Sequence, residues 1–136
     1  MMKDDCIFCK LANGVFPTRS IYEDEEFNVI LDVAPATKGH ALILPKNHAE
    51  NIFELPEDTA GKAFVLAKKM AQKMKDTLHC DGFNILQNNG VVAGQTVFHF
   101  HLHLIPRYED DGHEIRLEPT SPTAEELDAV KEILIQ

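Results

Sequence analysis

The 136-residue sequence lacks several features that mark particular classes of protein. It has no stretch near the ~18 consecutive apolar residues of a membrane-spanning helix. Met1 to Asp5 hold no apolar run, so we expect no secretory signal. Basic residues are few: 13 Lys and Arg stand against 22 Asp and Glu, a net charge of −9. This balance argues against a general nucleic-acid binder, although a local pocket could still hold a small anion.

Cysteine is also scarce, with three residues in all. An odd number without an export signal does not fit a disulfide framework, and we expect a cytoplasmic protein. Cys6 and Cys9 form a C-x-x-C pair, while Cys80 stands alone as a small apolar side chain or a surface thiol. The glycine-rich P-loop pattern is missing as well, which excludes an ordinary nucleoside triphosphatase.

The elements that the sequence does contain favour an α+β fold. Apolar side chains at helical spacing predict a long helix over Glu57–Leu78, with its lysines on a solvated face. A T-x-x-E capping box at Thr123 predicts a short C-terminal helix. Strands are predicted at Ser20–Tyr22, Phe27–Asp32, Ala41–Leu44, Phe83–Leu86 and Val97–Ile105, and a helical turn at Phe8–Asn13. Without strict strand–helix alternation, these elements indicate an antiparallel sheet with one long helix on a face.

The segment from His99 to Ile105 carries the chemistry, because histidine occupies every second position. On a strand, His99, His101 and His103 would share one face, opposite an apolar face. They could be the solvent side of a half-buried strand. They could hardly all bind one metal, because the outer two Cα atoms would lie ~13 Å apart while metal–nitrogen bonds are only ~2.1 Å.

The third interpretation of this segment is a nucleophile flanked by helpers. Imidazole attacks phosphorus near neutral pH and leaves again from a phosphohistidine. A central histidine would attack, while its neighbours orient it, bind phosphate oxygens and protonate the leaving group. Asn88, Gln95 and Thr96 lie just upstream in a glycine-containing turn and offer neutral donors for phosphate oxygens.

The run His99-Phe100-His101-Leu102-His103-Leu104-Ile105 resembles the signature of the histidine triad (HIT) family of nucleotide hydrolases and transferases. Flanking matches include Gly39-His40, Pro45-Lys46-Asn47-His48, Asn88-Asn89-Gly90 and Ala93-Gly94-Gln95-Thr96-Val97, so that the resemblance covers about Cys6 to Arg107. It implies a HIT domain over residues 1–107. The tail, residues 108–136, would be packed on this domain or extend it.

The resemblance also implies roles for individual residues. The catalytic group would be His99, His101, His103 and His40, in which His101 attacks the α-phosphorus and forms a nucleotidyl-histidine intermediate. His103 would assist the leaving group, and His40 would support the triad by hydrogen bonding. The nucleotide-binding positions would be Asp32 on the ribose hydroxyls and Asn88, Gln95 and Thr96 on phosphate. Asp32 could instead cap a turn.

A zinc site is implied in the same way. A subset of the family carries two cysteines and two histidines that match Cys6, Cys9, His48 and His99. Two thiolates and two imidazoles form a closed tetrahedral structural site. The alternative is a reduced, metal-free C-x-x-C pair. His79 and His113 match nothing in the family and are expected at the surface.

The resemblance implies a homodimer with a five-stranded antiparallel sheet per subunit, and an enzyme acting on purine nucleotides. One branch of the family cleaves nucleoside phosphoramidates, and the short chain, the Cys6/Cys9 pair and Asn88-Asn89-Gly90 resemble that branch, which we favour. The stretch Ala93-Gly94-Gln95-Thr96-Val97 and the ending Ile105-Pro106-Arg107 resemble the branch that cleaves dinucleoside polyphosphates. The alternatives are hydrolysis of dinucleoside polyphosphates, or a non-catalytic nucleotide sensor or adaptor. The intact triad argues against a pure adaptor, which would not require all three histidines.

Overall fold

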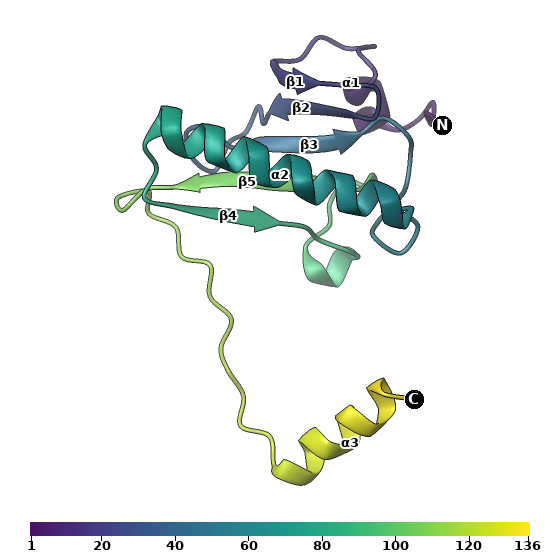
Figure 1. Ribbon diagram of the computed structural model, residues 1–136, viewed down its shortest axis with the longest axis vertical. Helices are drawn as coiled ribbons and strands as arrows, with labels where there is room; N and C mark the ends of the chain where they lie inside the picture. Colours follow the sequence, from purple (N-terminus) through teal and green to yellow (C-terminus); the bar gives the residue numbers. More distant parts are fainter.

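In the computed structural model, which describes residues 1–136, a five-stranded antiparallel sheet forms the centre of the protein (Figure 1). The strand order is β1-β2-β3-β5-β4, so β1 and β4 lie at the two edges. The strands are β1 (Ser20–Glu23), β2 (Phe27–Leu31), β3 (Ala41–Pro45), β4 (Gly82–Leu86) and β5 (Leu102–Arg107). The helices are α1 (Ile7–Ala12), α2 (Glu57–Leu78), α3 (Ala124–Leu134) and a short 3₁₀ turn at Val91–Ala93.

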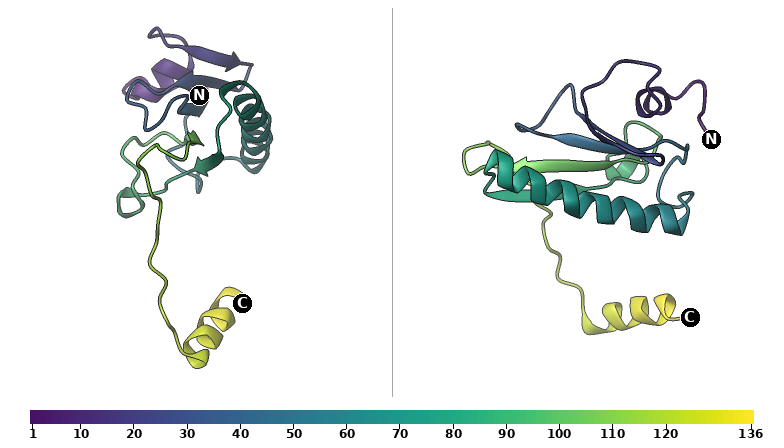
Figure 2. Two further views of the ribbon diagram at one scale, coloured as in Figure 1. Left: turned by 90° about the vertical axis from the view of Figure 1, so that its left-hand side faces the viewer. Right: turned by 45° about the horizontal axis from the view of Figure 1, so that its top comes forward.

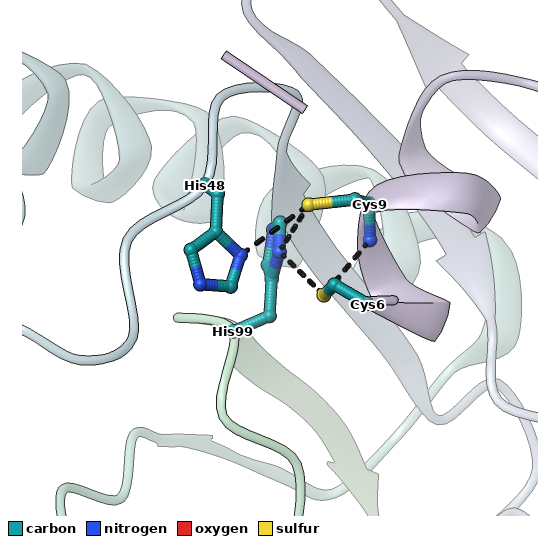
Figure 3. A group of neighbouring side chains, drawn as sticks. All are labelled: Cys6, Cys9, His48 and His99. Atoms are coloured by element: carbon teal, nitrogen blue, oxygen red, sulfur yellow. Dashed lines mark hydrogen bonds between the residues drawn. The ribbon is translucent and has the colours of Figure 1, made fainter. Parts of the chain in front are cut away.

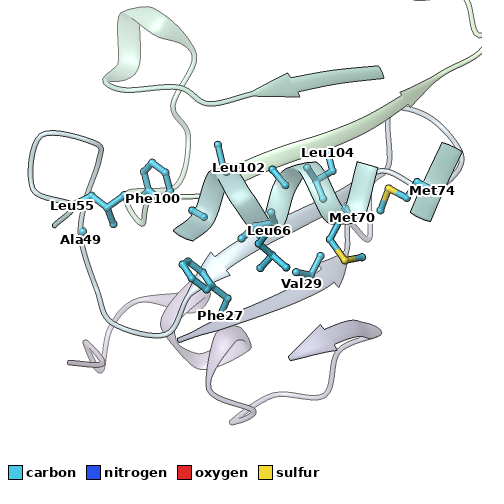
Figure 4. Close-up of a cluster of buried hydrophobic side chains, with 14 residues drawn as sticks. Phe27, Val29, Ala49, Leu55, Leu66, Met70, Met74, Phe100, Leu102 and Leu104 are labelled. Atoms are coloured by element: carbon cyan, nitrogen blue, oxygen red, sulfur yellow. The ribbon is translucent and has the colours of Figure 1, made fainter. Parts of the chain in front are cut away.

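Helix α2 covers one face of this sheet and builds the larger core (Figure 4). It begins and ends where the helical spacing predicts. Leu66, Met70 and Met74 recur on one side of the helix and belong to one buried cluster with Leu104 of β5 and with Phe100, which precedes β5. Burial of such side chains contributes about 1.5–3 kcal/mol each, which fixes the helix on the sheet.

Helix α1 lies on the opposite face of the sheet (Figure 2). Its Phe8, Leu11 and Ala12 pack with Ile30, Leu42 and Leu44 of β2 and β3 in a second, smaller cluster. The middle strands are therefore covered on both faces, which explains their continuous apolar runs. This face also carries the histidines.

Strand β5 is shorter at its start than the sequence predicts, because it begins at Leu102 rather than Val97. The β3–β5 ladder pairs Ile43 with Leu102, and its continuation would bring Pro45 opposite Phe100. Pro45 has no N–H to donate, and its carbonyl accepts the Nε2–H of His99 (2.8 Å). The ladder therefore stops, and Phe100 donates its N–H to Ala49 instead (2.7 Å).

The alternation of side chains nevertheless continues through this extended segment. Phe100, Leu102 and Leu104 belong to the core beneath α2. His99 and His101 lie on the other side, in edge-on contact with the ring of Phe8 on α1.

The C-terminal tail leaves the sheet at Arg107 and runs past the β4 edge to α3 (Figure 1). The predicted capping box is present: Thr123 accepts the N–H of Glu126, whose carboxylate accepts the N–H of Thr123. No residue of α3 is buried. Neither α2 nor α3 combines the length and apolarity that crossing a membrane would require.

Candidate active site and metal centre

The segment His99–His103 contributes imidazoles to two clusters of polar side chains on the α1 face of the sheet. One cluster holds Cys6, Cys9, His48 and His99, and the other holds Asp32, His40 and His103. In each cluster the potential ligand atoms lie within 4.8 Å of one another. The ring of His101 lies beside that of His103, with 4.9 Å between ring centroids.

The first cluster joins three distant parts of the chain (Figure 3). Cys6 is the N-cap of α1, Cys9 lies in its first turn, His48 follows β3, and His99 precedes β5. The Nδ1 atom of His99 lies 3.4 Å from both sulfurs, and the Nδ1 atom of His48 lies 3.3 Å from Cys9 Sγ.

The orientation of the His99 ring follows from its neighbours. Its Nε2 faces the carbonyl of Pro45, which can only accept, so the neutral ring carries its proton on Nε2. The lone pair of Nδ1 therefore points at the two thiols. Burial lowers the pKa of His99 to about 4, which keeps the ring neutral at pH 7.

These four residues fit a tetrahedral metal ion. Zn–S bonds of about 2.3 Å and Zn–N bonds of about 2.0 Å at a tetrahedral angle separate sulfur from nitrogen by about 3.5 Å, close to the 3.3 and 3.4 Å found here. Backbone N–H groups of Cys9 and Lys3 point at the sulfurs of Cys6 and Cys9, at 3.3 Å each, as in thiolate sites. Burial raises the pKa of the Cys9 thiol, and a bound cation would offset that cost. With four protein ligands, no position stays open for water.

The second cluster has a fixed proton arrangement that starts at the backbone. The N–H of Ala36 donates to His40 Nδ1 (2.9 Å), so the neutral His40 ring carries its proton on Nε2. That N–H faces His103 Nδ1 at 3.0 Å. His103 accepts there, so its own proton lies on Nε2. Burial lowers the pKa of His40, and lowers that of His103 to about 4.

His101 has the opposite arrangement. Its Nδ1 lies 2.6 Å from the carbonyl of His99, which can only accept, so the proton of the neutral ring is on Nδ1. This leaves a lone pair on Nε2. Burial lowers the pKa of His101, so the lone pair is available at neutral pH. Adjacent rings thus offer an acceptor on His101 and a donor on His103.

Asp32 has one of the two roles considered for it, the turn cap. One carboxylate oxygen accepts the N–H of Ala34 (2.9 Å) and caps the turn after β2. The other oxygen lies 3.7 Å from His40 Nε2. The carboxylate is partly exposed and lies beside the histidine pair.

The three predicted phosphate-binding residues have different environments. Gln95 is buried, donating to the carbonyls of Glu50 and Val97 and accepting from Gly90, so its amide holds the loop. Asn88 lies beside Gly94, whose φ of +96° favours glycine. Thr96 is exposed and lines a hollow of about 310 Å³ together with Cys6 and His48.

Three backbone groups in the site carry no signal in the sequence: the Ala36 N–H and the carbonyls of Pro45 and His99. His113 was expected at the surface and is indeed exposed, yet its Nε2–H donates to the carbonyl of Ala36 (2.8 Å). The tail thereby holds the loop that orients His40.

Comparisons with known proteins agree with this architecture. A sequence profile described as "HIT domain" matches residues 13–110. The structure of SMU.412c from Streptococcus mutans UA159 is similar with a TM-score of 0.93 and 39% identity, covering 98% of this chain and 85% of that one. The five-stranded antiparallel fold expected from the sequence is confirmed.

Two further relatives bear on the chemistry. A Zn-bound histidine triad family protein from Mycobacterium smegmatis is 40% identical, with a TM-score of 0.77, covering 85% of this chain and 84% of that one. The adenosine 5'-monophosphoramidase HNT1 of Saccharomyces cerevisiae is 39% identical over 105 residues, which are 77% of this chain and 64% of the yeast protein.

Proposed function

The chain belongs to the HIT family, and from that premise we propose that it hydrolyses purine nucleoside phosphoramidates and releases a nucleoside monophosphate. The observation that carries the proposal is the complementary pair of rings, with a lone pair on His101 Nε2 and an N–H on His103 Nε2. The yeast monophosphoramidase supports a nucleotide hydrolase and the choice of leaving group.

In the first step, His101 Nε2 attacks the α-phosphorus. A bond forms between this nitrogen and phosphorus, the bond from phosphorus to the amine breaks, and the amine takes the Nε2 proton of His103. The positive charge that His101 gains is offset by the proton that His103 gives up next to it. In the second step, water attacks phosphorus, returns a proton to His103 and releases His101.

Two neighbouring histidines act by fixing the proton positions of His101 and His103. His40 is a positioning residue, because its Nε2–H fixes the proton of His103 on the side of the leaving group. His99 contributes through its carbonyl, which fixes the proton of His101. We assign Asp32 to the ribose hydroxyls, Asn88 and Thr96 to phosphate oxygens, and Gln95 to the shape of the loop between them.

We propose that Cys6, Cys9, His48 and His99 bind a structural zinc ion. The Zn-bound mycobacterial relative supports this choice of metal. Zinc would tie α1 and the N-terminal segment to the His99 backbone, whose carbonyl orients His101. The ligation requires thiolates, which fits a reducing compartment such as the cytoplasm. We further propose that the protein is a homodimer, since Phe64, Val65 and Ile85 form an exposed apolar face along α2 and β4.

The test is AMP release from adenosine phosphoramidate, and separately from diadenosine tri- and tetraphosphate, with His101→Ala as the control. We expect the phosphoramidate to be cleaved with the higher kcat/KM and the variant to be inactive on every substrate. Faster cleavage of a dinucleotide would favour a polyphosphate hydrolase. AMP binding without turnover of any substrate would favour a nucleotide sensor and contradict the proposal.

A further inference from the structure

The loop between β2 and β3 carries the backbone group that orients His40, yet this part of the loop has little contact with the core. The Ala36 N–H donates to His40 Nδ1 (2.9 Å), which places the proton of His40 on Nε2 and, through it, that of His103 on Nε2 as well. Residues 33–36 are all exposed. A segment with so few buried contacts needs other bonds to keep one position.

The chain at and after the end of β5 supplies these bonds. The hydroxyl of Thr37 donates to the carbonyl of Pro106 (2.6 Å). The hydroxyl of Tyr108 donates to the carbonyl of Lys38 (2.8 Å). Both bonds hold the end of the loop that leads into β3. The exposed residues before it, which include the donor to His40, need a further support.

That support is His113. Its Nε2–H donates to the carbonyl of Ala36 (2.8 Å), the same residue whose N–H orients His40. The carbonyl and the N–H of Ala36 belong to adjacent peptide units. The bond from His113 therefore acts by holding Ala36 in position, because it is not made to the unit that contains the N–H. His113 lies beyond residues 13–110, the part of the chain that matches the HIT domain.

The turn that presents His113 is itself braced against the sheet. The carboxylate of Asp111 accepts from Arg107 at Nε (2.7 Å) and at Nη2 (3.0 Å). It also accepts the backbone N–H groups of Tyr108 (2.9 Å) and His113 (3.0 Å). Arg107 donates in addition to the carbonyl of His113 (2.6 Å) and to the side chain of Asn84 in β4 (2.9 Å). His113 is thus held by a closed turn whose bonds reach the sheet.

We propose that His113 is a positioning residue for the proton that the leaving group receives. Three hydrogen bonds of 2.8, 2.9 and 3.0 Å run in one direction, from His113 to the Ala36 carbonyl, from the Ala36 N–H to His40, and from His40 to His103. This inference rests on the proposed hydrolase, in which His103 Nε2 protonates the amine. It extends the working unit of the enzyme beyond the family match, to the turn that ends at His113.

The test compares three variants of the full-length chain. His113→Ala removes the donor, whereas the amide of His113→Gln can still donate to the Ala36 carbonyl. Glu114→Ala is the matched control, because Glu114 is exposed, adjacent in sequence, and paired with Arg116 (3.5 Å). His113 is also exposed, so all three variants should fold.

Two measurements are made on each variant. The value of kcat/KM is determined with adenosine phosphoramidate, whose amine needs a proton to leave, and with the p-nitrophenyl ester of AMP, whose phenolate leaves without one. Hydrogen exchange of the Ala36 amide is followed by NMR, which reports its bond to His40 independently of turnover.

For His113→Ala we expect kcat/KM to fall about three- to tenfold on the phosphoramidate and less than about twofold on the ester, since one hydrogen bond is lost. The Ala36 amide should exchange about fivefold faster or more. His113→Gln should recover most of both changes, and Glu114→Ala should behave like wild type. Equal losses on the two substrates, or no recovery in His113→Gln, would overturn the proposal.

Failure of this inference is distinguishable from failure of the proposed hydrolase. A wild-type protein that cleaves both substrates, with unchanged exchange of the Ala36 amide in His113→Ala, would contradict the role of His113 alone. A wild-type protein that cleaves neither substrate would contradict the hydrolase and, with it, the effect of His113 on the leaving group.

Discussion

Two side-chain clusters each receive one histidine from the short segment His99–His103, and they differ in what the imidazole nitrogens contact. In the cluster of Cys6, Cys9, His48 and His99, the Nδ1 atoms of both histidines turn inward toward sulfur. In the cluster of Asp32, His40 and His103, His40 donates one hydrogen bond to the ring of His103, and the Nε2–H of His103 has no partner in the cluster. The first arrangement is closed and suits a structural ion. The second keeps a reactive atom available.

The two clusters are coupled through the peptide between them. The carbonyl of His99 orients His101, while the side chain of His99 belongs to the closed cluster. The closed cluster therefore positions His101, the proposed nucleophile, without itself contacting substrate. Substitutions in either cluster should separate these two contributions.

The largest expected effect comes from changing His101, which lies beside the second cluster and outside the closed one. His101→Ala removes the nucleophile, so kcat for AMP release should fall on the order of 10³-fold or more. Bound zinc and the thermal midpoint should change little, because His101 lies outside the closed cluster. Mass spectrometry of the native protein and calorimetry check both. A variant that retains more than a tenth of wild-type activity would rule out nucleophilic attack by His101.

Breaking the closed side should chiefly cost stability. Cys9→Ser removes one ligand, and loss of a structural metal lowers the free energy of unfolding by about 4 kcal/mol. Denaturant titration and metal analysis measure this, with Cys80→Ser as the control because Cys80 lies outside the cluster. Equal stability and equal zinc content in Cys9→Ser and wild type would argue against the metal site.

A smaller effect is expected from loss of the hydrogen bond between His40 and His103, which fixes the position of the His103 proton. His40→Ala removes the Nε2–H donor, so the proton of His103 is no longer held on the substrate side. We expect kcat to fall roughly 10- to 100-fold with KM nearly unchanged. His40→Gln can still donate to His103 Nδ1 and should recover part of the loss. If both variants have the same kcat, His40 does not act through this bond.

The smallest effect is the pH dependence of stability. Burial lowers the pKa of His103 to about 4, whereas an unfolded histidine titrates at about 6.5. Above pH 6.5 the ring is neutral in both states. Between pH 6.5 and 4 the unfolded state binds more protons, so stability falls by about 1.4 kcal/mol per pH unit for this group. Urea titrations at pH 7, 6 and 5 should show a shallower fall for His103→Gln, and an identical slope would contradict the assignment.

Most of the fold could be predicted because its signals are local. The bounds of α2 follow from helical spacing, and the capping box at Thr123 locates α3. The start of β5 could not be predicted, because it depends on Pro45 in another strand and on a carbonyl that accepts from His99. Likewise, the sequence gives the imidazoles but not their tautomers, which are set by the backbone groups of Ala36 and His99.

The ligand set and the residues around the triad followed from resemblance to a family, whereas periodicity alone gave only three histidines on one side. The buried amide of Gln95 illustrates the limit. Its residue type fits a phosphate contact, but three backbone groups already occupy its polar atoms. Such use of a side chain depends on how the loop folds against Glu50, far away in the sequence.

The central claim is that His101 becomes covalently bonded to phosphorus, and the most direct measurement is to trap that bond. The wild-type protein is mixed with adenosine phosphoramidate, quenched in alkali to preserve a phosphorus–nitrogen bond, and mapped by peptide mass spectrometry. We predict an adenylyl group on His101 that forms before AMP accumulates and that is missing from His101→Ala. AMP release at full rate without an adduct, or an adduct on His103 instead, would contradict the account.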